Sequence, residues 1–191
     1  MPLHKTGERK LQILQALAGM LENPKGEKVT TAALAARLSV SEAALYRHFA
    51  SKAQMYEGLI EFIETTVFTL VNKIAQNEGI GRRQVLSIAR MLLEFAEQNP
   101  GMTRVLIGDA LVHEDERLQQ RMNQFVDRVE LAMRQSWKLA AIQGGPPDSE
   151  AADRAAMMVA FVLGRWHRFA KSGFQLTPME GAALQLAMLA E

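Results

Sequence analysis

The sequence predicts an all-α fold, and three observations lead to this prediction. Apolar residues recur at three- and four-residue spacing along almost the whole chain, which is the pattern of helices with one buried face. Good helix caps and strong helix breakers interrupt this pattern at short intervals. The chain contains no stretch with the apolar–polar alternation of a strand, and no internal repeat or low-complexity tract.

Three short helices are predicted at the N-terminal end. The first, over residues 9–22, ends at Asn23-Pro24, because a proline disfavours helical geometry in the residue before it. Either Thr30 or Thr31 can cap the second helix, and Ser41 can cap the third, since a hydroxyl accepts from the free amides of a first turn. The tight connection between the second and third helices is typical of a helix-turn-helix.

Longer helices make up the rest of the chain. Ser51 and Gln54 form a capping box at the head of a helix that ends near Gly79. The last helix is expected to open at Thr177-Pro178-Met179-Glu180, where the threonine, the first-turn proline and the glutamate suit a helix N-terminus. The helices between them are predicted over residues 82–98, 102–107, 114–141 and 150–171.

The composition is that of a globular chain without a membrane span. Hydrophobic residues make up 48% and charged residues 23% of the sequence, which excludes a disordered protein. No apolar run is long enough to cross a bilayer, and the first residues lack the apolar core of a signal peptide, so we expect a cytoplasmic location. The chain has no cysteine, which excludes disulfides and thiolate metal sites.

Charge is unevenly distributed along the chain, although the formal net charge is only +1. The first 55 residues carry eight cations and four anions, whereas the remainder is net negative. A basic end can dock on phosphate while the acidic body faces another partner. The alternative is a chance asymmetry of an ordinary protein surface.

Residues 30–52 have the layout of a DNA-reading helix-turn-helix. In such a unit the second helix enters the major groove, and its N-terminal residues meet base edges. Four residues occupy that position here: Ser41, Glu42, Ala43 and Ala44. Glu42 can accept a hydrogen bond from cytosine N4, and the alanine methyls can touch a thymine methyl.

Phosphate contacts are expected around this helix. Hydroxyl, ring and cationic groups flank it: Thr30, Thr31, Tyr46, Arg47, His48 and Lys52. Such groups hold a protein in register on a duplex without reading its sequence. For Tyr46 and His48, spacing alone leaves an ordinary helix surface with a buried ring as an equal alternative.

The same residues resemble a known DNA-binding signature. The segments 30–35 (Thr-Thr-Ala-Ala-Leu-Ala), 40–49 (Val-Ser-Glu-Ala-Ala-Leu-Tyr-Arg-His-Phe) and 51–52 (Ser-Lys) look like those of TetR-type regulators. The resemblance implies a TetR-like all-α homodimer, with an N-terminal three-helix DNA-binding domain at residues 1–52 and a helical, C-terminally dimerising body at 53–191. It also implies that residues 42–44 lie near bases and that Tyr46, Arg47, His48 and Lys52 lie on phosphates.

The resemblance extends into the body. Residues 59–64 (Leu-Ile-Glu-Phe-Ile-Glu), 99–106 (Asn-Pro-Gly-Met-Thr-Arg-Val-Leu) and 115–119 (Asp-Glu-Arg-Leu-Gln) are similar to the SlmA family of nucleoid occlusion factors, a branch of the TetR type. In that family, dimers bind specific chromosomal sites and can spread along the DNA. The DNA-bound protein then engages the tubulin-like division protein FtsZ and prevents ring assembly over the chromosome.

This second resemblance implies a nucleoid-associated protein with FtsZ as its partner. In the family the engaging surface lies on the body near the DNA-binding unit, and Phe62, Met91 and Asn99 are the candidates here. The alternative for Phe62 and Met91 is a plain core position, and the alternative for Asn99 is the end of a helix. Cationic or small residues would suit an acidic partner better than three residues of the same predicted face, which are Leu70, Glu94 and Gln98.

The last two long helices are expected to form the dimer interface, as they do in TetR-type bodies. Small and apolar residues make a ridge that a partner helix can approach closely: Ala152, Ala156, Val159, Ala160 and Leu163. The alternative is that this surface packs wholly within one subunit. A dimer would present two DNA-binding heads, one formed by residues 1–52 of each subunit, to a palindromic DNA site whose half-sites lie about one helical turn apart.

Two other functions compete with nucleoid occlusion. A ligand-responsive TetR-type transcriptional repressor would use the same head, and it would have one operator beside a regulated gene instead of many chromosomal sites. An enzyme would need a nucleophile with a positioned base or a metal cluster, which four dispersed histidines and no cysteine do not provide. The sequence indicates no cofactor and no metal.

Overall fold

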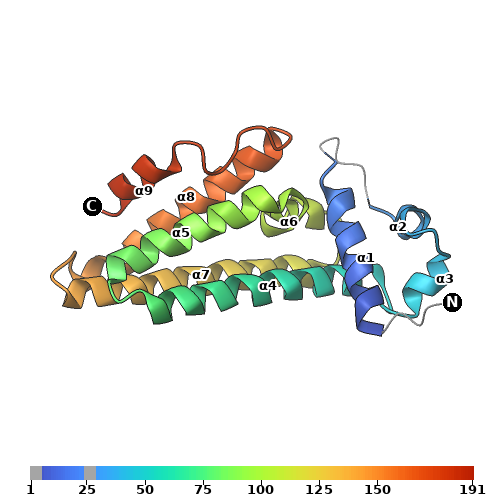
Figure 1. Ribbon diagram of the computed structural model, residues 1–191, viewed down its shortest axis with the longest axis horizontal. Coiled ribbons are helices and arrows are strands. Elements are labelled where there is room, and N and C mark those ends of the chain that lie inside the picture. The colour runs from blue at the N-terminus through green and yellow to red at the C-terminus, as the bar shows by residue number, and fades with distance from the viewer. Residues whose placement is uncertain (1–5, 24–28) are drawn as a thin grey trace.

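A computed structural model describes residues 6–23 and 29–191, and every regular element in them is a helix (Figure 1). The helices are α1 (Thr6–Leu21), α2 (Thr31–Arg37), α3 (Glu42–Tyr46), α4 (Lys52–Asn77), α5 (Gly81–Gln98), α6 (Pro100–Leu106), α7 (Glu116–Ile142), α8 (Ala151–Lys171) and α9 (Ala182–Leu189). The all-α prediction is confirmed. No helix of the described ranges has both the length and the apolar character that crossing a bilayer requires.

The three N-terminal helices gather at one end of an elongated molecule (Figure 1). The helices α4, α5 and α7 run along its long axis, and α8 packs on α5 and α7. The 26-residue helix α4 contacts α1 as well as α5 and α7. The division of the chain at residue 52 stays a prediction, because the helix that begins there contacts both parts.

Aromatic side chains fill the middle of the body. The side chains of Trp137, Trp166 and Phe125 are almost completely buried. The ring of Phe125 meets the ring of Phe68 edge to face, with 5.4 Å between the centroids. The indole N–H of Trp166 donates to the carbonyl of Leu92 at 3.0 Å, and this hydrogen bond fixes α8 on α5.

The predicted starts of α2, α3 and α4 are confirmed, with two refinements, whereas α1 begins at Thr6, three residues before the predicted start. Thr30, and not Thr31, caps α2, since its hydroxyl accepts from the amide of Ala33 at 3.1 Å. Ser41 caps α3 and Ser51 caps α4 in the same way. The carboxamide of Gln54 reaches back to the amide of Ala50 at 2.8 Å, one residue before the position that a capping box uses. The predicted break at Pro24 lies outside the described residues.

The predicted start of the last helix is wrong. Residues 177–181 form a turn, and α9 begins only at Ala182, after Gly181 with a left-handed φ of 67°. The guanidinium of Arg165 explains the difference, because it donates to the carbonyl of Pro178 at 3.0 Å and also to the carbonyl of Glu180. Those carbonyls therefore face α8 and do not accept from a following turn of helix.

Candidate nucleic-acid interface

The helices α2 and α3 are short, and burial holds them in place. Leu34 of α2 and Leu45 of α3 are almost completely buried in one apolar cluster with Leu17 of α1 and Leu59 of α4. Ser39 lies between the two short helices with a φ of 54°, which turns the chain sharply. The arrangement presents the opposite face of α3 to a ligand.

The exposed face of α3 carries small groups and one carboxylate. Ser41, Glu42 and Ala43 are exposed, and Ala44 is half-buried. The carboxylate of Glu42 accepts from the hydroxyl of Thr31 at 2.5 Å, so it ties the first turn of α3 to the first turn of α2. This bond orients the carboxylate and leaves the two alanine methyls as the apolar contacts of the helix. The small side chains on this face allow the helix to approach base edges closely.

Tyr46 and Arg47 leave the far end of α3 toward solvent. The tyrosine side chain is 44% exposed, and Arg47 is exposed as well. His48 is half-buried, and its buried Nδ1 atom has no hydrogen-bond partner among the residues that the structure describes. Of the groups predicted to contact phosphate, Tyr46 and Arg47 are therefore the two long side chains that are exposed.

Lys52 is engaged within the protein. Its ammonium group pairs with the carboxylate of Glu114 and lies 5.6 Å from the centroid of the Tyr56 ring. Burial, and after it the charge of Glu114, raises the pKa of the Tyr56 hydroxyl above its ordinary value, so this ring stays neutral. A phosphate that contacts Lys52 would share the ammonium group with Glu114. Local spacing could not predict this partner, which lies 62 residues away in the sequence.

The three candidates for the FtsZ contact differ in exposure. Phe62 is 41% exposed on α4, and Met91 of α5 is half-buried against the core. The carboxamide of Asn99 donates to the carbonyl of Phe95 at 2.8 Å. Asn99 is the C-cap residue of α5 and directly precedes Pro100, the first residue of α6. Phe62 is thus the candidate with the largest apolar surface available to a partner.

The outward face of α8 carries most of the predicted dimer ridge. Ala156 and Ala160 are exposed, and Ala152 and Leu163 are half-buried. Val159 points into the subunit instead and is only 5% exposed, because it lies one residue off the outward face of the helix. Three large apolar side chains flank the ridge and are 48–67% exposed: Met157, Leu184 and Met188.

An open groove of about 580 Å³ separates α8 from α9. The small residues Ala160 and Gly164 form its floor on the α8 side, and Gln185 of α9 faces them. Toward the end of α8 the groove becomes basic, with His167, Arg168 and Lys171 along it.

The interior of the body is closed to small molecules at the place where α5, α7 and α8 meet. The pocket there has a volume of about 10 Å³ and is lined by Leu92, Phe125, Val159 and Trp166 among other apolar side chains. Small-molecule sites usually measure about 300–1,000 Å³. The packed aromatic core leaves room for no more than a water molecule at this point.

Two family models match the chain, one at each end. Residues 26–59 match the model described as "Bacterial regulatory proteins, tetR family". Residues 80–191 match an SlmA-like model described as "Tetracyclin repressor-like, C-terminal domain". The two matches correspond to the helix-turn-helix with the start of α4, and to the body from α5 onward.

Relatives are similar over nearly their full length. The protein named nucleoid occlusion factor SlmA from Marinomonas sp. (strain MWYL1) is 47% identical, over 98% of this chain and 96% of its own. The proteins of the same name from Alteromonas mediterranea and Vibrio vulnificus are 47% and 43% identical, over 94% and 97% of this chain and 93% and 95% of their own.

Two solved structures share the fold. The transcriptional regulator FadR from Bacillus subtilis, in complex with stearoyl-CoA, matches with a TM-score of 0.76 at 10% identity, over 95% of this chain and 97% of its own. A TetR-family transcriptional regulator from Pectobacterium atrosepticum matches with a TM-score of 0.66 at 16% identity, over 98% and 96%. At such low identity the likeness concerns the fold alone.

Proposed function

The chain belongs to the TetR family of bacterial regulatory proteins, in the SlmA-like branch, and we propose that it is a nucleoid occlusion factor. As a homodimer it binds palindromic sites on the chromosome through α3. Bound to DNA, it engages FtsZ and prevents division rings from assembling over the nucleoid, where the protein resides. Members of this family are DNA-binding regulators, and the chain is not an enzyme.

The similarity of the body is the observation that carries this proposal. A conserved fold alone would explain likeness in the helix-turn-helix, which TetR-type regulators of many functions share. Identity of 47% over 98% of the chain extends through α4 to α9, where a partner other than DNA would bind. The interpretation that this observation supports best is a body function shared with the proteins named nucleoid occlusion factors.

The closed interior argues against a ligand-responsive repressor. Such a repressor needs a site that holds an effector between body helices, and such sites usually measure about 300–1,000 Å³. The space among α5, α7 and α8 measures about 10 Å³, and an open pocket between α6, α7 and α8, lined by Met122 and His167 among others, measures about 240 Å³. Phe125 and Trp166, which line the smaller space, are almost fully buried. In the proposed function, DNA is the ligand that selects the active arrangement of the two heads.

The proposed dimer uses the outward face of α8 and the groove beside α9. Replacing Ala160 by glutamate would bury two carboxylates at the centre of that contact, so we expect Ala160→Glu to be a monomer. Sedimentation velocity measures the oligomeric state directly. Ala75→Glu, at an exposed alanine near the far end of α4, should stay dimeric. If Ala160→Glu sediments as a dimer at micromolar concentration, the proposed interface is wrong.

The proposed partner contact is tested with purified FtsZ. A duplex selected by the wild-type protein from a random pool is added with the protein to polymerising FtsZ, and the sedimented polymer is measured. We expect DNA-bound wild-type protein to reduce the pellet, and we expect Phe62→Ala to bind the same duplex equally well without reducing it. The physical reason is the loss of the exposed ring on α4 as an apolar anchor.

A second apolar truncation controls for general loss of surface. Ile142 is 85% exposed at the end of α7, at the opposite end of the molecule from the helix-turn-helix. Ile142→Ala should reduce the FtsZ pellet as wild type does. An undiminished pellet with wild-type protein and saturating DNA would reject nucleoid occlusion and leave a DNA-binding regulator of another kind.

A further inference from the structure

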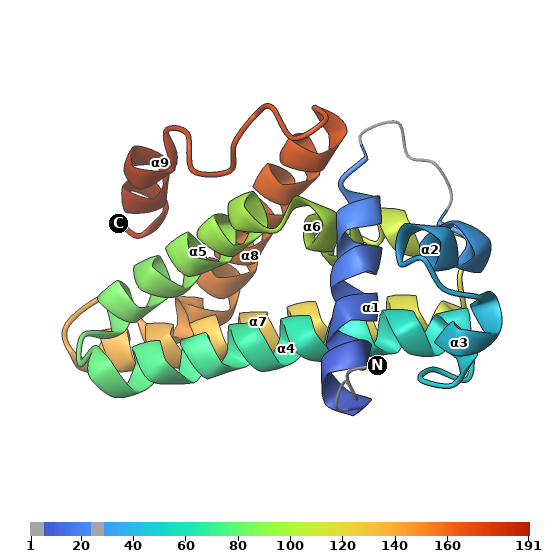
Figure 2. The same ribbon diagram turned by 45° about the vertical axis from the view of Figure 1, so that its right-hand side comes forward.

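The first turn of α6 lies directly against the last turns of α1 (Figure 2). A Cβ atom on Gly101 would lie 2.1 Å from the carbonyl oxygen of Ala18, so a larger residue there would force the two backbones apart. Because α2 packs on α1 and α3 packs on α2, this contact joins the DNA-binding unit to the body, in addition to the contact of α1 with α4.

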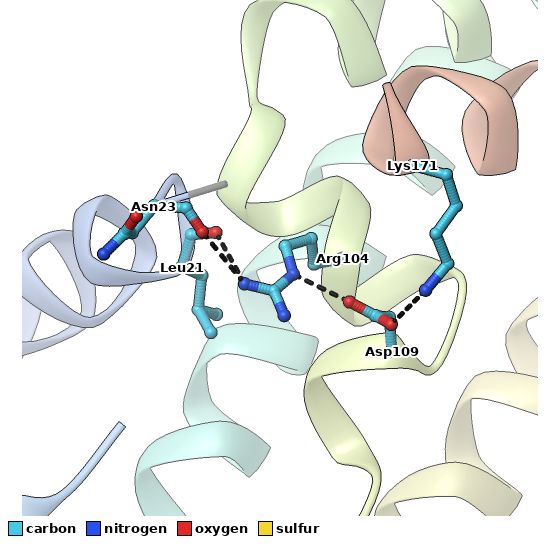
Figure 3. Close-up of polar contacts among 5 residues, drawn as sticks. All are labelled: Leu21, Asn23, Arg104, Asp109 and Lys171. Carbon is cyan, nitrogen blue, oxygen red and sulfur yellow. Dashed lines mark hydrogen bonds and ion pairs between the residues drawn. The ribbon is translucent and has the colours of Figure 1, made fainter. Parts of the chain in front are cut away.

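Arg104 lies one turn after Gly101 and holds the end of α1 (Figure 3). One guanidinium nitrogen donates to the carbonyls of Leu21 and Asn23, each at 3.4 Å. The last carbonyls of a helix have no partner within it, and a cation is favoured at that end of the helix dipole. The arginine therefore supplies from α6 the C-terminal cap of α1.

The other side of the same guanidinium connects to α8 (Figure 3). Nε of Arg104 donates to one oxygen of Asp109 at 2.8 Å, and the ammonium group of Lys171 donates to the other oxygen at 2.7 Å. Burial would raise the pKa of Asp109, but the hydrogen bonds and charges of Lys171 and Arg104 outweigh it, so the pKa lies below its ordinary value and the group is a carboxylate. Lys171 is the last residue of α8 and lines the groove beside α9.

We infer that Arg104 is a positioning residue for DNA binding: through the end of α1 on one side and Asp109 and Lys171 on the other, it fixes the DNA-binding unit at one orientation relative to α8. In a dimer built on α8, that orientation sets the separation of the two recognition helices. The inference rests on the DNA-binding step of the proposed function and does not need FtsZ. The Arg104 side chain is 15% exposed and lies on α6, outside the helix-turn-helix.

The first arm of the test measures the orientation without DNA. The chain has no cysteine, so two spin labels attach only where cysteines are introduced, at exposed Ala36 of α2 and exposed Gln135 of α7. Double electron–electron resonance then measures the distance between the label on α2 and the label on α7. Labelled protein is diluted in unlabelled protein, so that the two labels of one subunit are measured. We expect one narrow distance in wild type and at least an approximately twofold broader distribution in Arg104→Ala.

The second arm measures the consequence for DNA. Palindromic duplexes selected by wild type are lengthened or shortened by one base pair between the half-sites. Wild type should lose about tenfold in affinity for the altered spacing, because the two heads then no longer meet both half-sites. Arg104→Ala should lose about threefold or less, since loosely held heads adapt to either spacing. Arg104→Lys, which keeps the charge but not the fork of donors, should lie between them.

Two further variants separate positioning from general stability. Arg154 of α8 is similarly buried and pairs with Glu150 in its own neighbourhood, so Arg154→Ala should keep the narrow distance and the spacing preference. Lys171→Gln changes an exposed side chain and should broaden the distance partially, even if Arg104→Ala folds poorly. Unchanged width in both Arg104→Ala and Lys171→Gln would overturn the inference. Failure of wild type to select any duplex would refute the proposed function, while the distance arm would still decide the role of Arg104.

Discussion

Replacing Tyr46 and Arg47 together by alanine is expected to lower the affinity for every duplex by about 100-fold or more, because each hydrogen bond to a charged group contributes about 1.5–3 kcal/mol. Both side chains leave the end of α3 toward solvent, and within residues 6–23 and 29–191 neither has a side-chain partner that would limit its reach. The loss should be similar for specific and nonspecific DNA, since phosphate contacts carry no base information. Fluorescence anisotropy with both kinds of duplex measures it.

The salt dependence reports on the arginine of the pair. Arginine displaces a counterion when it neutralises a phosphate and tyrosine does not, so the double variant should lose about 0.9 from the slope of log affinity against log salt concentration. Arg82→Ala removes an exposed cation at the far end of α5 and should change neither affinity nor slope. A double variant that binds all duplexes within about threefold of wild type would contradict the assignment of this end of α3 to phosphate.

The variant Gly101→Val should lower the free energy of unfolding by about 3 kcal/mol, the upper part of the range for overpacking a close contact. The neighbour of its Cβ atom would be the backbone carbonyl of Ala18, at 2.1 Å, and a backbone atom yields only if α1 or α6 moves. Urea denaturation followed by circular dichroism measures the change. Gly7→Ala has open space around its Cβ atom and should stay within about 0.5 kcal/mol of wild type.

The variant should also weaken DNA binding, since a displaced α1 would move α2, which packs on it, and α3, which packs on α2. We expect the folded fraction of Gly101→Val to bind palindromic duplexes more weakly than wild type. If Gly101→Val has the stability and the DNA affinity of wild type, the α1–α6 contact does not hold the DNA-binding unit on the body.

Local sequence patterns were sufficient where local chemistry decides the structure. Ser41 and Ser51 cap helices because a hydroxyl next to a first turn always finds free amides, and the structure bears this out at both positions. The all-α fold follows from the same kind of short-range information. The candidate DNA-binding residues could be named for the same reason, because they lie within a single short segment.

Long-range contacts account for what the sequence did not predict. Arg165 turns the carbonyls of Pro178 and Glu180 toward α8 from 13 and 15 residues away, and so delays α9 to Ala182. Glu114 holds the ammonium group of Lys52 although 62 residues separate them. Helical spacing placed Val159 on the predicted dimer ridge, but its side chain is buried in the core of the subunit. An error of one residue along a helix is enough to move a side chain from one face to another. None of these partners follows from local spacing.

Genome-wide mapping of the sites that the protein occupies in living cells tests the central claim most directly. A nucleoid occlusion factor that acts from DNA must be present over much of the chromosome, so we expect many dispersed sites that share one palindrome, and loss of all of them in the Tyr46→Ala/Arg47→Ala variant. Occupancy confined to one operator beside a regulated gene would contradict the account and indicate a transcriptional repressor.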